Sequence, residues 1–400
     1  MRITILSPSR KRAIKMSQHI QELRFNFSGL RWIILVFALA FCSGVQAQSW
    51  RWTFEDVDVH GAQTSIIADK DGNLHLSYYV PDNFGELRYA FRSAAESRWY
   101  KDSLDQHLGE FSTGITLDAN DGPGICYTPR KLKYIHWTGH KWSPAQEVDP
   151  GSGLIAYHCS IKYTRADAPE ITWYLESIFN LRYAVLKDGA WEARSVEVGT
   201  QSGKWNSLSL DQNDLPHVAY SSFKMGELHY AYFDGMQWVR NILDSNPLAG
   251  PCGMGASLVL DARGNPMISY HDLNSLKFAH FDGRKWLTET IEELPPYVDW
   301  SWKNFCTTIL VDHNGNPHIS YESHLLGLKH AWWDGKRWHT QLIRASQGAS
   351  IFESSMTIDR NDDLYIAFSD PIDGSLKVAI GKATAVPVIT SADKKEDSKN

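Results

Sequence analysis

The 400-residue sequence has only five cysteines, one long apolar run and no excess of positive charge. Five cysteines are too few for a disulfide scaffold, and a chain of this length buries a large core without cross-links. The net charge of −6 disfavours a nucleic-acid partner. Beyond residue 47 no stretch repeats its apolar residues with a helical period of 3.6, which excludes a helical bundle.

The apolar run is "WIILVFALAF", residues 32–41, which follows a basic segment and precedes the small residues of "SGVQA". It is far shorter than the roughly 20 residues that a spanning helix needs. This pattern is typical of a secretory signal peptide over residues 1–47, with either Met1 or Met16 as the start. We therefore expect a secreted or periplasmic protein with no membrane span. Without residues 1–47 the chain has 33 basic and 45 acidic side chains, a net charge of −12.

What the sequence does contain is an internal repeat. "SLSLDQNDLPHVAYSSFKMGELHYAYFDGMQW" from Ser207 matches "SLVLDARGNPMISYHDLNSLKFAHFDGRKW" from Ser257, and "TILVDHNGNPHISYESHLLGLKHAWWDGKRW" from Thr308 repeats it again. Fainter copies bring the total to seven. The marker position recurs at spacings of 46 to 51 residues, at Asp69, Asp118, Thr164, Asp211, Asp261, Asp312 and Asp359.

Each copy holds four short runs rich in β-branched and aromatic residues, separated by Gly, Pro, Asn and Asp. Four strands per 45 or so residues is typical of a propeller blade. The last copy stops after its third run, "LKVAIG", whereas an unmatched fourth run, "WRWTFEDVDV", begins at Trp50. The sequence thus predicts an all-β, seven-bladed β-propeller over residues 48–383, closed by its N-terminal strand. The charged tail, residues 384–400, is expected to be disordered.

The turn between the third and fourth runs reads "FDGMQW", "FDGRKW", "WDGKRW" and "WTGHKW". It resembles the hairpin of sialidase-type propeller repeats (BNR or Asp-box repeats), and the chain is similar to bacterial secreted propellers that carry them. That resemblance implies a carbohydrate ligand, since such relatives include sialidases, polysaccharide lyases and lectins. The three equivalent arginines of a sialidase site are not found.

In a propeller the first strand of each blade is innermost, and the fourth-to-first and second-to-third connections emerge on one face, called here the mouth. The repeated "DxxGxP" turns then lie on the back face. We interpret them as plain turns rather than calcium loops, because the third residue varies and no Glu follows at the twelfth position.

Residues that recur at one repeat position are expected to pack the blades. These are the histidines His75, His217 and His318 and the tyrosines Tyr78, Tyr127, Tyr220, Tyr270 and Tyr321. Residues that break the repeat at the mouth are the candidates for a site. Proton transfer is assigned to His158, His271 and His324, and charge neutralisation to Arg130, Lys204 and Lys303. Substrate contacts are predicted for Lys303, Trp205, Trp300, Trp302, Asp272, Glu322, Glu353, Asp370 and Tyr174.

The leading hypothesis is a polysaccharide or glycan bound across the mouth, with β-elimination on a uronate as the best matched chemistry: a His or Tyr removes the C5 proton while a cation neutralises the carboxylate. A lectin or cell-surface interaction module is the alternative. A glycoside hydrolase would instead need two carboxylates from Glu322, Glu353, Asp272 and Asp370. No cofactor or metal is expected, and we expect a monomer. The blade map also predicts two disulfides, Cys252 with Cys306 and Cys126 with Cys159.

Overall fold

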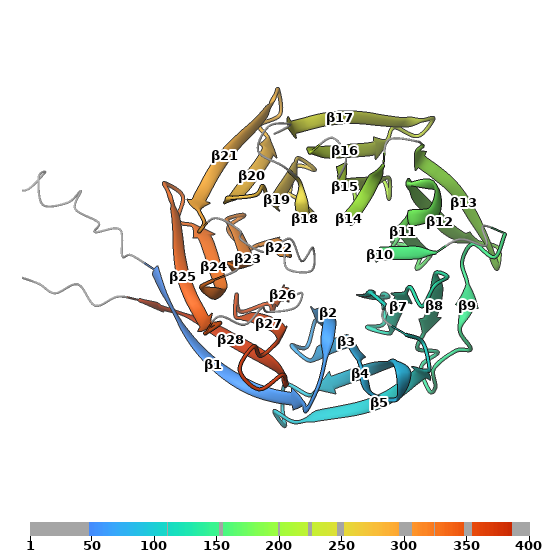
Figure 1. Ribbon diagram of the computed structural model, residues 1–400, viewed down its shortest axis with the longest axis horizontal. Coiled ribbons are helices and arrows are strands. Elements are labelled where there is room, and N and C mark those ends of the chain that lie inside the picture. Colours follow the sequence, from blue (N-terminus) through green and yellow to red (C-terminus); the bar gives the residue numbers. More distant parts are fainter. Residues whose placement is uncertain are drawn as a thin grey trace, which may run out of the picture. The chain divides into compact units, whose positions relative to one another are not determined.

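The computed structural model describes residues 48–109, 111–151, 155–198, 201–222, 226–245, 252–295, 306–323, 325–347 and 354–385. This part of the chain forms seven antiparallel four-stranded sheets, and Figure 1 shows them as blades around a common axis. The predicted seven-bladed β-propeller is confirmed. The only helices among the described residues are two 3₁₀ turns, η1 (Asp82–Phe84) and η2 (Glu176–Ile178).

The first four blades follow one another along the chain, each with its strands in sequence order. Blade 1 contains β2 (Ala62–Ala68), β3 (Leu74–Val80), β4 (Glu86–Arg92) and β5 (Trp99–Gln106). Blade 2 contains β6 (Thr113–Leu117), β7 (Pro123–Tyr127), β8 (Lys133–His136) and β9 (Gln146–Glu147). Blade 3 contains β10 (Ala156–Tyr163), β11 (Pro169–Leu175), β12 (Asn180–Lys187) and β13 (Ala190–Glu197). Blade 4 contains β14 (Ser202–Leu210), β15 (Pro216–Ser222), β16 (Glu227–Phe233) and β17 (Trp238–Ser245).

The ring closes in blade 7, which joins strands from the two ends of the described chain. Blade 5 contains β18 (Met254–Leu260), β19 (Pro266–His271), β20 (Ser275–Phe281) and β21 (Trp286–Glu293). Blade 6 contains β22 (Thr307–Val311), β23 (Pro317–Ser323), β24 (Gly327–Trp333) and β25 (Trp338–Ala345). Blade 7 contains β26 (Ser355–Ile358), β27 (Leu364–Ser369), β28 (Leu376–Ala385) and β1 (Gln48–Asp58). The pairing of β1 with β28 is the predicted closure by the N-terminal strand.

Serine side chains link the innermost strands of neighbouring blades. The Ser207 hydroxyl of blade 4 accepts a hydrogen bond from the Leu258 backbone N–H of blade 5 at 3.0 Å, and Ser257 accepts one from Ile309 of blade 6 at 3.1 Å. The same bond recurs at Ser65 and Ser160. β-Strand pairing stops at each blade boundary, so this backbone N–H has no partner within its own sheet. The first serine of the repeated "SLxLD" run accepts its hydrogen bond instead.

The recurring tryptophan of the "DGxxW" turn packs across the blade boundary. It lies edge-on to an aromatic side chain in the third strand of the preceding blade, the arrangement that ring quadrupoles favour. The pairs, with ring-centroid distances, are Tyr89–Trp142 at 4.9 Å, Tyr134–Trp191 at 5.4 Å, Tyr183–Trp238 at 5.5 Å, Tyr230–Trp286 at 5.0 Å and Phe278–Trp338 at 5.1 Å. The turn that defines the repeat is thus a device for packing one blade on the next.

The recurring tyrosines also serve the blade boundaries. Tyr270 of β19 donates its hydroxyl hydrogen to Asp244 at the end of β17, at 2.7 Å, and Lys277 of β20 pairs with the same carboxylate. Equivalent clusters contain Tyr78 with Asp58 and Arg88, Tyr127 with Asp105 and Lys133, Tyr220 with Glu197 and His229, and Tyr321 with Glu292 and Lys329. Each buried tyrosine therefore ties its blade to the last strand of the preceding one.

The back-face turns are held by their own aspartates. The Asp69 carboxylate accepts hydrogen bonds from the backbone N–H groups of Asp71 and Asn73, both at 2.8 Å. The same two bonds recur at Asp118, Asp211, Asp261, Asp312 and Asp359. The aspartate of each turn thus binds two backbone N–H groups of that turn, which agrees with their interpretation as plain turns. His75 and His318 contact these aspartates and are buried, consistent with the expected packing role.

The two predicted disulfides are wrong for this structure, in which the four described cysteines form no disulfide. Cys252 is enclosed in the core between blades 4 and 5, beside Ala219 and Leu228, whereas Cys306 belongs to blade 6. Cys126 and Cys159 are adjacent, and a hydrogen bond joins their side chains. The predicted proximity therefore holds for Cys126 and Cys159, which pack in one core cluster, whereas Cys252 packs at a different blade boundary from blade 6.

Asp58, at the end of β1, tests how strongly the ring depends on its closing strand. Burial opposes ionisation of this carboxyl, but hydrogen bonds from Lys101, Tyr78 and Arg88 outweigh it and lower its pKa to about 2. Because this pKa is lowered, the stabilisation is present above the unfolded pKa of about 4 and is lost as pH falls towards 2. We expect Asp58→Asn to lower the free energy of unfolding by about 2 kcal/mol at pH 7.

Urea unfolding at pH 7 and at pH 3 measures this. The difference between wild type and Asp58→Asn should shrink at the lower pH. Asp56→Asn is the matched control in the same strand, since its side chain is 80% exposed and its ion pair with Lys377 is worth less than about 1 kcal/mol. A loss in Asp56→Asn as large as in Asp58→Asn would contradict the assignment.

Candidate functional site

The mouth has a β-bulge in the innermost strand of several blades, and His158 and Trp205 occupy it in blades 3 and 4. Both residues have left-handed backbones, with φ of 50° and 47°. The same position is Gln63 in blade 1, with φ 52°, and Gly255 in blade 5, with φ 60°, and the strand register shifts at each of these places. A non-glycine residue in this region is strained by about 1 to 3 kcal/mol, and such residues gather at functional sites.

Three predicted site residues lie together at the bulges of blades 3 and 4. The His158 and Trp205 rings are 5.6 Å apart between centroids. Burial and then the charge of Lys204 lower the pKa of His158 to about 4, so the imidazole is neutral near pH 7. Neutral imidazole is the form that accepts a proton.

Tyr174 lies beneath this group. The Lys204 ammonium is 5.7 Å from the centre of the Tyr174 ring, and burial raises the pKa of Tyr174 to about 12. The ring is only 1% exposed. Tyr174 therefore supports Lys204 from below and does not face solvent, in contrast to the predicted substrate contact.

Two further residues complete what we call the mouth cluster: Arg130, Tyr157, His158, Lys204 and Trp205. Arg130 is exposed, and its carbonyl oxygen accepts a hydrogen bond from the Ala156 N–H at 2.7 Å, which places it beside β10. Tyr157 is 37% exposed, and its ring centroid is 6.4 Å from that of His158. The mouth cluster thus combines a neutral imidazole, an accessible phenol and two cations.

Sequence reasoning missed Tyr157 and also Asn206, which holds the bulges in place. The Asn206 amide donates hydrogen bonds to the carbonyl oxygens of His158 and Gly203, and its own oxygen accepts one from Thr172 at 2.7 Å. Asn206 therefore joins the bulge of blade 3 to that of blade 4. A sequence signal existed for Tyr157: it directly precedes the residue that breaks the repeat.

The other described candidates are not in the mouth cluster. His271, at the end of β19, is fully buried, and this burial lowers its pKa to about 4. Asp272 accepts hydrogen bonds from the N–H of Asn274 and the hydroxyl of Ser275, at 3.0 and 2.7 Å. The structure gives His271 and Asp272 no access to a ligand at the bulges of blades 3 and 4.

The buried carboxylates serve the blade framework. Glu322 accepts a hydrogen bond from the backbone N–H of Ser354 at 3.1 Å. Asp370 is fully buried and forms an ion pair with Arg344 at 2.7 Å. Neither is placed as one of two open carboxylates on either side of a substrate, which is the arrangement that a glycoside hydrolase needs.

Five predicted contact residues lie outside the described residues: Trp300, Trp302, Lys303, His324 and Glu353. Their assignment stays a prediction. Within the described ranges, no group of three or more His, Cys, Asp or Glu side chains is arranged to hold a metal ion. No helix in those ranges is long and apolar enough to cross a membrane.

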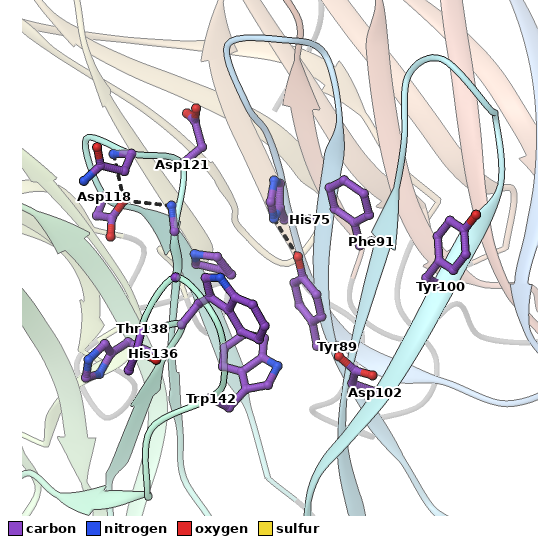
Figure 2. A pocket seen from close by; sticks show the side chains of 15 residues that line it. His75, Tyr89, Phe91, Tyr100, Asp102, Asp118, Asp121, His136, Thr138 and Trp142 are labelled. Atoms are coloured by element: carbon purple, nitrogen blue, oxygen red, sulfur yellow. Dashed lines mark hydrogen bonds between the residues drawn. The ribbon is translucent and has the colours of Figure 1, made fainter.

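A second concave region, which we call the back groove, lies between blades 1 and 2 on the face opposite the mouth. Its volume is about 850 Å³, within the usual range for small-molecule sites. Figure 2 shows that His75, Tyr89, Phe91, Tyr100 and Asp102 line it from blade 1. Blade 2 contributes Trp137, Thr138 and Trp142 from one turn and residues 118–123 from another.

The fold places the chain among β-propellers, and the comparisons with known proteins agree. No protein-family model matches the chain, and no curated protein matches it. Among solved structures, the lectin BP39L from Burkholderia pseudomallei matches with a TM-score of 0.59 and 12% identity, over 82% of this chain and 99% of that one. The polysaccharide lyase Uly1 matches with a TM-score of 0.52 and 10% identity, over 80% and 89%. At these identities the likeness shows the fold alone.

The strained backbone at His158 gives a direct test of the bulge. Glycine adopts positive φ without penalty, and Gly255 already fills the equivalent position in blade 5. We expect His158→Gly to change the free energy of unfolding by less than about 1 kcal/mol, and His158→Val to lower it by about 1 to 2 kcal/mol more, because a β-branched side chain opposes a left-handed backbone. Urea denaturation measures both. Equal stability of the two variants would show that the bulge is not strained.

Proposed function

We propose that this protein is an exported carbohydrate-binding propeller that holds an acidic polysaccharide at the mouth cluster and cleaves it by β-elimination. The observation that carries the proposal is that neutral His158 has the exposed ring of Tyr157 6.4 Å away, between centroids, and also feels the charge of Lys204. A uronate offers the groups that such a set would engage: a carboxylate for the cations and a C5–H for a base. The resemblance of the repeated turn to sialidase-type repeats, and the fold shared with a lyase and a lectin, support a carbohydrate ligand.

The chemistry assigns one role to each residue. Lys204 and Arg130 bind the C6 carboxylate, which stabilises the negative charge that develops when the C5 proton leaves. The His158 imidazole accepts that proton. The electron pair of the C5–H bond forms the C4–C5 double bond, the C4–O bond breaks, and the phenol of Tyr157 protonates the leaving oxygen. Trp205 offers its edge beside His158 as a wall for the sugar ring.

A lectin without turnover is the second candidate. Trp205 is only 8% exposed and stands against His158, which also fits a rigid binding surface. The two candidates differ in one observable, because only the lyase forms unsaturated ends. A glycoside hydrolase is less well supported, since Glu322 and Asp370 are engaged within the framework.

The proposal is tested by incubating the protein with a panel of uronate polysaccharides and following the ultraviolet absorbance of new unsaturated ends. Wild type should produce a signal, and His158→Gly should lower turnover by about 10²-fold or more, the usual contribution of a general base. His217→Ala is the control: His217 pairs with Tyr230 inside blade 4, so it should lower the melting temperature and leave turnover intact. Binding without absorbance in wild type would favour the lectin.

The pH dependence of kcat/KM tests the role of Lys204. Burial and the Lys204 charge lower the pKa of His158 to about 4, so the base is active above that pH and is lost as pH falls through 4. Replacing the cation in Lys204→Gln removes the second cause, and the acid limb should move to higher pH. An acid limb that stays in place while kcat/KM falls would show that Lys204 binds substrate but does not tune His158.

A further inference from the structure

The back groove differs from two other blade boundaries in a hydrogen bond between a tryptophan and an acid. At the boundary of blades 7 and 1, the Trp99 indole N–H donates to the Glu55 carboxylate at 3.2 Å. At the boundary of blades 5 and 6, Trp338 donates to Glu289 at 2.9 Å. In both cases the glutamate lies three residues after a tryptophan in the fourth, outermost strand of the preceding blade. The bond closes the outer edge of the boundary.

Between blades 1 and 2 the corresponding acid is Asp102, which is one methylene shorter than glutamate. The Trp142 indole nitrogen is buried here without a hydrogen-bond partner. Asp102 is exposed, and no side chain in the described ranges forms a hydrogen bond or ion pair with its carboxylate. With the shorter acid, the hydrogen bond between the Trp142 indole N–H and the Asp102 carboxylate is therefore not made at this boundary.

The unmade contact coincides with the larger cavity. The back groove measures about 850 Å³, against about 540 Å³ for the groove at the boundary of blades 5 and 6, where the Trp338–Glu289 bond is made. The two grooves have the same parts: the Trp142 and Trp338 turns, the Tyr89 and Phe278 rings, and an "xxGxP"-type turn of the next blade. Of these two grooves, the narrower is the one in which the Trp–Glu bond is made.

The lining of the back groove matches a neutral sugar. Trp137, Trp142 and Tyr100 supply aromatic surface, whose negative ring faces attract the C–H groups of a pyranose. Tyr100 is 44% exposed and stands at the rim. Asp102 and Asp121 present carboxylates that accept hydrogen bonds from hydroxyls, and the Lys70 ammonium lies 2.5 Å from Asp121. The lining holds three carboxylates, since Asp118 also contributes one, and a second cation, Arg98, lies 5.1 Å from the centre of the Tyr100 ring. This acidic balance disfavours a uronate here, the reverse of the charge at the mouth cluster.

We propose that the back groove is a second binding site, specific for a neutral hexopyranose and distinct from the mouth cluster. The sugar stacks on the aromatic wall of Trp137, Trp142 and Tyr100. Its hydroxyl groups donate to the free Asp102 carboxylate. Asp102 stands at the position where Glu55 and Glu289 close two other boundaries, and the site does not depend on turnover at the mouth.

The test uses Asp102→Glu, which introduces the residue found at the boundaries of blades 7 and 1 and of blades 5 and 6. The longer carboxylate should reach Trp142 as Glu289 reaches Trp338, which closes the groove without loss of the fold. The probes are the methyl glycosides of glucose, galactose, mannose and fucose, with methyl glucuronide as the charged comparison, followed by saturation-transfer NMR and calorimetry. Wild type should bind at least one neutral glycoside and bind the glucuronide more weakly.

In Asp102→Glu the affinity for that glycoside should fall by about tenfold or more, while the melting temperature stays the same or rises. Tyr100→Ala, at an exposed rim position, should also weaken binding. If Asp102→Glu folds poorly, the affinity of Tyr100→Ala tests the proposal in its place. Glu289→Gln is the matched control at the other boundary and should leave the affinity unchanged. Absence of binding by wild type, or full affinity in Tyr100→Ala or in folded Asp102→Glu, overturns the proposal. Uronate turnover, measured in parallel, reports on the mouth cluster separately.

Discussion

The hydrogen-bonded pairing of β1 with β28 joins residues 48–58 to residues 376–385, and the closed ring depends on it. The strand does more than complete a sheet. Trp50 is buried against His318 and His330 of blade 6, and Asp58 is held by Tyr78 and Arg88 of blade 1. One strand therefore contacts three blades. The other six sheets pair strands that are consecutive in the chain, so only this sheet must join residues more than 300 positions apart, at a cost in loop-closure entropy.

Once the ring is closed, repeated residues satisfy the same need at each boundary. Inner serines, buried tyrosines with their carboxylates, and edge-on tryptophans each bond one blade to the next. Because this framework is supplied by repeated positions, the remaining positions are released from packing. His158 and Trp205 occupy the bulge position that is Gly255 in blade 5. Asp102 occupies the position that is Glu55 or Glu289 at two other boundaries. Both candidate sites arise at such departures from the repeat.

The two sites lie on opposite faces and carry opposite charge. The mouth cluster presents Arg130 and Lys204, whereas the back groove presents Asp102 and Asp121. Electrostatic complementarity selects ligands mainly by excluding those whose charge has the same sign as the site. A polysaccharide that contains both uronate and neutral residues would meet a suited surface on each face, so a neutral segment could anchor the protein while an acidic one enters the mouth.

The sequence by itself determined the repeat, the number of blades, the closure and the structural role of the recurring tyrosines and histidines, because a period of 46 to 51 residues with four strand-like runs admits few folds. It also placed Arg130, His158, Lys204 and Trp205 at one mouth. Only the tertiary structure decided that Tyr157 is accessible, that His271 is enclosed, that neither predicted disulfide forms and that a groove opens beside Asp102. These outcomes depend on which blade boundary a side chain packs into, and on whether a side chain that is one methylene longer or shorter reaches its partner. The spacing of residues along the chain encodes neither of these.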